Sequence, residues 1–161
     1  LMAGRTLLDA GMKLKIIIVG DGPEKAAITH LVDRLNLSGR VLLTGSQPDV
    51  RPYLAQSDVF VHCSGIESFP MVILEAMAMG RPIVAASSGG IGEQVVHGEN
   101  GLLYPVGDVQ ALAACIHHIV ARRRTVEMGQ HSRRRIEQQF TLSRMVRQYE
   151  AFFLNLASEK L

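Results

Sequence analysis

The order in which apolar runs follow one another along the chain most constrains what it can fold into. Short runs rich in β-branched residues alternate with longer segments whose apolar residues recur at helical spacing. This alternation is typical of a parallel sheet whose strands are joined by helices. We expect strands at 15–19, 41–44, 59–62, 82–85 and 102–104, and helices at 6–11, 24–35, 50–56, 71–79, 91–97, 109–120, 123–139 and 142–156.

The ends of these segments carry the residues that usually start and stop helices. Asp108 and Thr141 stand where N-caps belong, and Gly80 stands where a glycine commonly follows the last helical residue. The strand runs are nearly continuously apolar, which indicates strands buried on both faces. The sequence therefore predicts an α/β fold, a Rossmann-like, doubly wound, mainly parallel sheet with helices on both faces, in one domain over residues 1–161.

Composition excludes several other classes of protein. A chain of 161 residues with 47% hydrophobic residues and a formal charge of +2 has the size and apolar content of one globular domain. It has neither an apolar run of about 18 residues nor a signal-peptide pattern, so we expect a cytoplasmic location. Cys63 and Cys115 have no CxxC partner, so we interpret them as small buried apolar residues rather than disulfide or zinc ligands.

The loop after the first expected strand is rich in glycine. In open parallel sheets, ligands lie beyond the carboxyl ends of the strands. Gly20, Asp21 and Gly22 follow the strand directly, and glycine lets the backbone approach a ligand closely. The next helix begins there and offers free N–H groups to a phosphate. The motif is not GxGxxG, so a plain tight turn explains it equally well.

The loop after the third expected strand leads through Pro70 into a helix. Proline suits a first helical turn, where its missing N–H is not needed. The N–H groups around Phe69, Met71 and Val72 then point into the cleft and form a site for an anion. His62 ends the strand before this loop, and either contact with a ligand or a place in the core would explain it.

Two glutamates flank this helix start, with seven residues between them. Glu75 lies one turn beyond Met71 on the same helical face, and Glu67 lies in the loop. Ionised carboxylates accept hydrogen bonds, often from two adjacent sugar hydroxyls at once. The alternative is structural: Glu67 caps a backbone N–H, and Glu75 pairs with Arg81 or another cation.

A third glycine-rich loop follows the fourth expected strand. Gly89 and Gly90 allow backbone conformations that open a nest of N–H groups toward a ligand. Glu93 favours the following helix N-terminus electrostatically.

Together these segments resemble the C-terminal domain of retaining GT-B glycosyltransferases, the large glycosyl transferase group 1 (family 4). The resemblance spans about residues 14–149. It rests on ordered blocks at 20–23, 58–61, 67–85, 89–93, 98–103 and 107–108, the third of which contains Glu67 and Glu75.

The resemblance implies a role for each block. Glu67 would contact hydroxyls of the donor sugar and Glu75 the ribose, which makes them the expected catalytic residues. The donor-binding backbone would comprise Gly20, Asp21 and Gly22 near the phosphates, Ser68, Phe69, Pro70, Met71 and Val72 along the diphosphate and sugar, and Gly45, Ser46 and Gln47 near the base. The donor would be a nucleotide diphosphate sugar, with UDP the favoured nucleotide. No cofactor or metal is implied: Asp-x-Asp does not occur, and helix N–H groups and cations would meet the leaving-group charge.

Relatives carry further parts that this sequence does not contain. They have an upstream strand, a segment whose Arg and Lys neutralise the diphosphate, and an N-terminal domain that binds the acceptor. We therefore expect a fragment of a longer protein that is inactive alone. We do not transfer the missing cationic roles to Arg5 or Lys13. Since the absent strand would lie mid-sheet, the core could be completed by an oligomer, a swapped partner, a substituting segment or further chain before the first residue.

Arginines gather in the last quarter of the chain, at 122–124 and 133–135 and at Arg144 and Arg147. A solvated helical surface explains them, and peripheral contact with the anionic inner membrane surface is the alternative. Nucleic acid is disfavoured because aromatic residues make up 5% of the chain and none interleave with the arginines.

Two other functions remain open. A non-catalytic nucleotide-binding α/β module would need the glycine-rich loops but not the glutamate pair. A nucleotide-sugar epimerase of the same shape would need additional acid and base residues, and none stands out.

Overall fold

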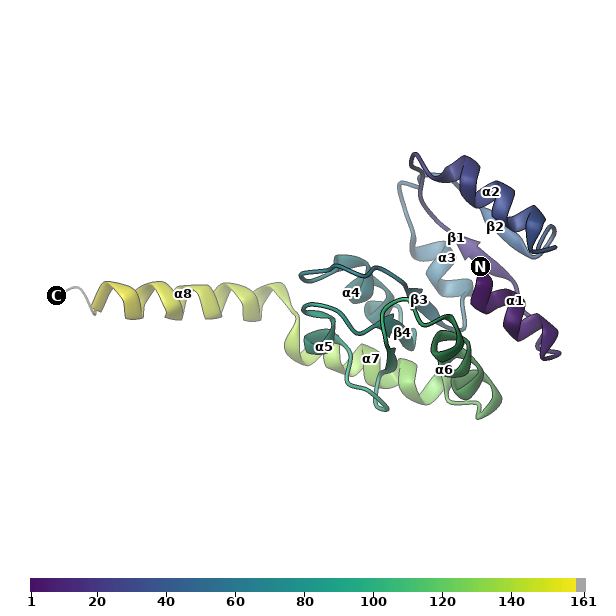
Figure 1. Ribbon diagram of the computed structural model, residues 1–161. Coiled ribbons are helices and arrows are strands. Elements are labelled where there is room, and N and C mark those ends of the chain that lie inside the picture. Colours follow the sequence, from purple (N-terminus) through teal and green to yellow (C-terminus); the bar gives the residue numbers. More distant parts are fainter. Residues whose placement is uncertain (159–161) are drawn as a thin grey trace.

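The computed structural model describes residues 1–158, and in them strands and helices alternate as expected (Figure 1). The elements are α1 (Met2–Asp9), β1 (Ile16–Ile18), α2 (Lys25–Arg34), β2 (Val41–Leu43), α3 (Arg51–Gln56), β3 (Phe60–His62), α4 (Met71–Ala78), β4 (Ile83–Ala86), α5 (Ile91–Gln94), β5 (Gly101–Tyr104), α6 (Val109–Ala121), α7 (Thr125–Gln139) and α8 (Leu142–Ser158).

All paired strands are parallel, but they form two sheets rather than one. β1 pairs with β2, with Ile16 opposite Val41. β4 lies between β3 and β5, so Ile83 is opposite both Phe60 and Gly101. Within residues 1–158 no strand joins β1 to β3, so the expected single sheet is divided at that point.

β4 is the centre of the core, and its two faces pack against different helices. Ile83 and Ala85 lie in a cluster with apolar residues of α3, α4 and α5. Val84 and Ala86 lie in a second cluster with residues of β5, α6 and α7. Because alternate residues of a strand point to opposite faces, this pattern confirms the doubly wound arrangement with helices on both faces.

The expectation that all strands are buried on both faces is wrong for the first three. Every residue of β4 is buried, whereas every residue of β1 is only partly buried. The middle residues of β2 and β3 are exposed, Leu42 by 54% and Val61 by 36%. These three strands and β5 each have a strand on one side only, but β5 stays mostly buried because it packs with α6 and α7.

α1 connects the first sheet to the rest of the molecule. Its buried residues Ala3 and Leu7 pack with Ala113 of α6. The helix begins four residues earlier than predicted. The additional turn includes Gly4, a poor helix former. A Cβ atom at Gly4 would lie 2.6 Å from Cδ1 of Ile16, so α1 packs closely against β1 at this glycine.

The predicted helix ends are largely confirmed. Asp108 caps α6, since its carboxylate accepts from Ala111 N–H at 2.8 Å. Thr141 Oγ1 accepts from Arg144 N–H at 3.3 Å, and Gly80 has a φ of +65° after α4. α5 ends at Gln94, earlier than predicted, because the backbone at Val95 is extended.

Several arginines of the last quarter stabilise the fold instead of forming only a solvated surface. Arg135 donates to the carbonyl oxygens of Gln94 and Glu93 at 3.0 and 2.8 Å. Arg124 donates to the Gly98 carbonyl at 3.1 Å. These bonds attach α7 to the end of α5 and to the loop before β5.

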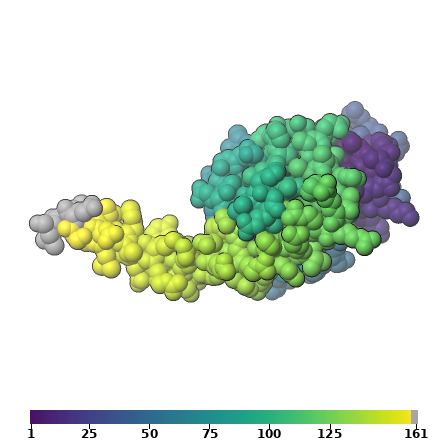
Figure 2. All heavy atoms as spheres, turned by 90° about the horizontal axis from the view of Figure 1, so that it is seen from below, coloured from purple at the N-terminus to yellow at the C-terminus, as the bar shows by residue number. Residues whose placement is uncertain are grey.

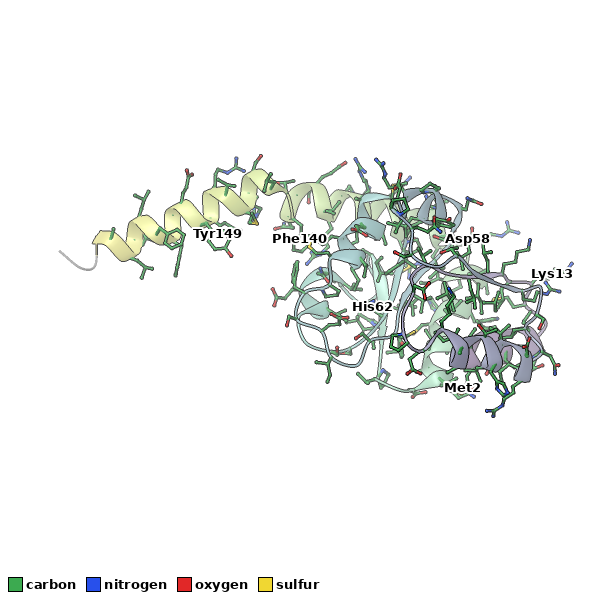
Figure 3. All side chains as sticks on the ribbon, turned by 90° about the horizontal axis from the view of Figure 1, so that it is seen from above. Met2, Lys13, Asp58, His62, Phe140 and Tyr149 are labelled. Atoms are coloured by element: carbon green, nitrogen blue, oxygen red, sulfur yellow. The ribbon has the colours of Figure 1, made fainter. Side chains whose placement is uncertain are left out.

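α8 projects away from the body of the molecule, as Figures 1 and 2 show. None of its described residues is buried. Its exposed apolar side chains, including Tyr149 in Figure 3, recur at helical spacing: Leu142, Met145, Val146, Tyr149, Phe152, Phe153 and Leu156. No helix within residues 1–158 is long and apolar enough to cross a membrane.

Candidate functional site

The loop between β3 and α4 carries the first of the two glutamates. Glu67 is partly buried, and its Oε1 lies 3.0 Å from Nε2 of His62, the last residue of β3. Within residues 1–158 no backbone N–H donates to this carboxylate, so the structural alternative, in which Glu67 caps a backbone N–H, is wrong. Sequence analysis missed this pair, although a histidine at a strand end five residues before the glutamate was a usable signal.

α4 begins without a side-chain cap, as expected of an anion site. The sequence predicts Pro70 in the first helical turn, but in the structure it is the N-cap residue, one position earlier. No side chain caps the helix. The N–H groups of Met71 and Val72 lie in the first turn, where helical N–H groups have no partner within the helix. The buried Gln94 stabilises the start of α4, since its Nε2 donates to the Pro70 carbonyl at 3.1 Å.

The glycines after β4 support the β3–α4 loop. Gly90 N–H donates to the Ser68 carbonyl at 3.0 Å. A Cβ atom at Gly89 would lie 1.6 Å from the Glu67 carbonyl oxygen, and φ at Gly89 is +47°. The expected nest of free N–H groups is thus wrong at Gly90, because that group bonds to the neighbouring loop.

Glu75 is exposed on α4 and makes no ion pair or hydrogen bond with another side chain in the part of the chain that the structure describes. Its suggested partner Arg81 is occupied elsewhere: it donates to the carbonyls of Ser57 and Met79 at 2.7 and 2.9 Å. The structural alternative for Glu75 is therefore wrong for Arg81. The carboxylate is available to a ligand.

The loops after β1 and β2 contact each other. Gly20 N–H donates to the Gly45 carbonyl at 2.9 Å. Asp21 accepts from Gly22 N–H at 2.9 Å and from Lys25 Nζ at 2.8 Å. The bond to Lys25, followed by that to Gly22, lowers the pKa of the Asp21 carboxyl below its ordinary value.

Ser46 is exposed beside this contact. Gln47 donates through Nε2 to the Thr44 carbonyl at 2.8 Å, which fixes the turn after β2. The predicted donor-binding residues thus fall into two groups, one after β1 and β2 and one after β3. Hydrogen bonds among the described residues stay within each group.

One cysteine is not placed as predicted. Cys63 is exposed next to His62, and Cys115 is partly buried. Burial, followed by a hydrogen bond with Cys63, raises the pKa of the Tyr104 hydroxyl well above its ordinary value. Burial also raises the pKa of the Cys115 thiol.

A surface cavity of about 540 Å³ lies away from these loops. It is bounded by the end of α4 and the start of α7, and Asp58, Arg81 and Arg133 line it. Pro82, which precedes β4, also lines it, so the cavity is at the amino end of that strand. No three His, Cys, Asp or Glu side chains within residues 1–158 are placed to hold a metal ion.

Comparison with known proteins adds the decisive observation. The family model described as glycosyl transferases group 1 matches residues 3–122. The chain belongs to this family. The resemblance of the ordered blocks to a group 1 glycosyltransferase domain is thereby confirmed.

Two curated relatives illustrate the match. The chain is 38% identical to N-acetyl-alpha-D-glucosaminyl L-malate synthase of Bacillus anthracis over 143 residues, which are 88% of this chain and 38% of the relative. It is 40% identical to the lipopolysaccharide core biosynthesis glycosyltransferase LpsE of Rhizobium meliloti, over 77% of this chain and 38% of the relative. The chain therefore spans well under half the length of these relatives.

Solved structures agree on the fold. Anabaena HepE in complex with UDP superposes with a TM-score of 0.84 at 30% identity, covering 95% of this chain and 44% of HepE. TarM superposes with a TM-score of 0.86 at 22% identity, covering 94% of this chain and 31% of TarM, and so supports the fold alone. The individual roles expected of Glu67, Glu75 and the loop backbones stay predictions.

Proposed function

We propose that this chain is the donor-binding part of a glycosyltransferase that moves a hexose from a nucleotide diphosphate sugar to an acceptor hydroxyl with retention of configuration. The observation that carries the proposal is the carboxylate pair at the start of α4. Glu67 is held in place by His62, and Glu75 has no side-chain partner among the described residues. Membership of the glycosyl transferases group 1 supports this proposal.

Each predicted group has a task in this proposal. Glu67 accepts hydrogen bonds from hydroxyls of the donor sugar, and Glu75 accepts them from the ribose. The backbone from Ser68 to Val72 binds the diphosphate at the uncapped start of α4, where the helix dipole favours negative charge. The donor extends toward the phosphate-binding loop at 20–22 and the base-binding turn at 45–46. No metal takes part.

UDP is the proposed nucleotide. Solved structures of the similar HepE contain UDP and UDP-glucose. The acceptor binds to a further domain of a longer protein, without which this chain does not complete a transfer. The reaction belongs to polysaccharide or glycolipid synthesis on the cytoplasmic side of a membrane, with peripheral contact at its surface.

Calorimetric titration of the chain with UDP and UDP-glucose tests the role of each glutamate. We expect Glu75→Ala to weaken binding of free UDP by about 10-fold or more, since hydrogen bonds to a charged group contribute about 1.5–3 kcal/mol. Glu67→Ala should weaken UDP-glucose binding while leaving free UDP nearly unchanged. Glu99→Ala is the matched control, because Glu99 contacts His131 away from the site.

Two outcomes would contradict the proposal. If both glutamate variants bind UDP and UDP-glucose as the unmodified chain does, the carboxylate pair has no part in donor binding. If GDP- or ADP-sugars bind more tightly than UDP-glucose, the choice of nucleotide is wrong although the donor class stands.

A further inference from the structure

His62 is the residue through which the fold controls the orientation of Glu67. Its Nε2 lies 3.0 Å from Glu67 Oε1, a normal hydrogen-bond distance. The side chains of His62 and Glu67 are exposed by only 14% and 27%. The contact is therefore shielded from water far more than an ordinary surface pair is.

The histidine ring itself has little freedom to move. His62 ends β3, and Val61 beside it pairs with Val84 of the buried strand β4. The ring lies nearly parallel to that of Phe60, with an interplanar angle of 15° and centroids 6.5 Å apart. Figure 3 shows His62 within the body of the molecule.

The backbone of Glu67 is fixed as well. The glycine loop after β4 presses against it, since no Cβ atom fits between Gly89 and the Glu67 carbonyl. Gly90 donates to the next carbonyl, that of Ser68, at 3.0 Å. With both ends of the side-chain contact held, one carboxylate oxygen of Glu67 is occupied, and the other has no hydrogen-bond partner within residues 1–158.

We propose that His62 is a positioning residue for donor binding: it donates from Nε2 to Oε1 of Glu67 and thereby presents Oε2 to a hydroxyl of the donor sugar. This inference rests on the proposed function. A carboxylate that is already oriented loses less rotamer entropy when the sugar binds, so the preorganised pair increases affinity for the sugar part of the donor alone.

A merely structural pair would behave differently. If the contact only anchored the loop, its loss would disturb the backbone from Ser68 to Val72 and weaken nucleotide and nucleotide-sugar binding alike. A positioning role affects only the additional affinity that the sugar contributes. The ratio of the dissociation constants for UDP and UDP-glucose separates the two roles.

The experiment compares two substitutions at His62 by calorimetric titration with UDP and UDP-glucose. His62→Leu removes the donor while keeping an apolar side chain. We expect the ratio of the dissociation constant for UDP to that for UDP-glucose to fall about 10-fold. The dissociation constant for UDP itself should stay unchanged. His62→Gln should restore most of the ratio, because its amide nitrogen can reach the position of Nε2 and donate.

Three results would overturn the inference: an unchanged ratio in His62→Leu, equal loss of UDP and UDP-glucose affinity, or no rescue by His62→Gln. If neither ligand binds, thermal unfolding without ligand still tests the inference. His62→Leu, Glu67→Gln and the double variant should shift the midpoint of thermal unfolding non-additively. Additive shifts would show that the contact is absent in solution.

The same titrations distinguish failure of the inference from failure of the proposed function. If the unmodified chain binds UDP-glucose more tightly than UDP, and Glu67→Ala removes the difference while His62→Leu does not, the function stands and the role of His62 is wrong. If Glu67→Ala leaves the difference intact, the role proposed for Glu67 in binding the donor sugar is wrong, and if Glu75→Ala also binds both ligands as the unmodified chain does, the proposed function fails with it.

Discussion

The two sheets of the molecule are built from similar apolar runs, yet the central strand of one is fully buried and both strands of the other are only partly covered. Ile83 in β4 is completely buried, whereas Ile17 in β1 is only partly so. The difference follows from neighbours: β4 has a strand on each side and helices on both faces, and β1 has one strand neighbour. Apolar content predicts that a segment is a strand. Burial depends on what lies beside it.

The same contrast appears in the loops that these strands carry. The loop after β3 is held by backbone contacts from the glycine loop and by the buried Gln94. The loop after β1 is held by the exposed pair of Asp21 and Lys25 and by one bond between Gly20 and Gly45. The groups proposed to bind the sugar therefore lie on the more rigid of the two regions.

Matched substitutions in the two sheets test this contrast most strongly. Ile83→Ala removes a fully buried side chain from the central strand and should reduce the free energy of unfolding by about 2–5 kcal/mol. Ile17→Ala makes the same change in β1, where the side chain already contacts solvent. Its effect should be about half as large or less.

Urea unfolding followed by circular dichroism measures both free energies. The unmodified chain and the exposed substitution Leu42→Ala in β2 serve as controls, since Leu42 is 54% exposed. Equal losses for Ile83→Ala and Ile17→Ala would show that β1 is as well packed in solution as β4, which the divided sheet does not allow.

The next largest effect is expected at Gly89, in the region built on β3, β4 and β5. Gly89→Ala would place a Cβ atom 1.6 Å from the Glu67 carbonyl, in a backbone with φ of +47°. We expect a loss of about 1–3 kcal/mol in unfolding free energy, together with weaker UDP-glucose binding. Gly92→Ala is the matched control, because no atom lies within 4 Å of its added Cβ.

The comparison is made by thermal unfolding and by calorimetry on the same two variants. Gly92→Ala should be neutral or slightly stabilising, since alanine favours the helix α5 in which it lies. If Gly89→Ala matched Gly92→Ala in both measurements, the close approach of the two loops would not exist in solution.

Local patterns were enough to predict the elements but not their neighbours. The sequence located all five strands, since each is a short apolar run between turn residues. It misjudged the start of α1, where Gly4 disfavours a helix by propensity but packs closely against Ile16. It also misjudged the burial of β1, β2 and β3, which is set by residues far away in the chain.

The site shows the same limit. The sequence marks the glycines at 89 and 90 as unusual, but it does not show that they admit the carbonyls of Glu67 and Ser68 or that the Gly90 N–H is bonded to Ser68. The pairing of His62 with Glu67 could have been suspected from their spacing. The absence of an ion pair between Glu75 and Arg81 could not have been suspected, because it depends on Arg81 donating to the carbonyls of Ser57 and Met79.

Acid sensitivity of the first region gives the smallest expected effect. The pKa of Asp21 is lowered in the folded chain, first by Lys25 and then by Gly22 N–H. A carboxyl with a lowered folded pKa contributes stability above its unfolded pKa, about 3.9, and loses that contribution as the pH falls through the folded value. The stability of the region built on β1 and β2 should therefore fall below about pH 4.

Lys25→Gln removes the larger cause and keeps the smaller one. NMR titration of the Asp21 carboxyl should show its pKa rising toward the ordinary value without reaching it, because Gly22 still donates. Lys13→Gln, which changes another exposed lysine of this region, is the control and should leave the Asp21 titration unchanged. Both residues of the Asp21–Lys25 pair are largely exposed, so the effect on stability is small and should shrink further in high salt. An Asp21 pKa that does not respond to Lys25→Gln would mean that the loop after β1 is held by its backbone, like the loop after β3, and that the two regions are more alike than their burial suggests.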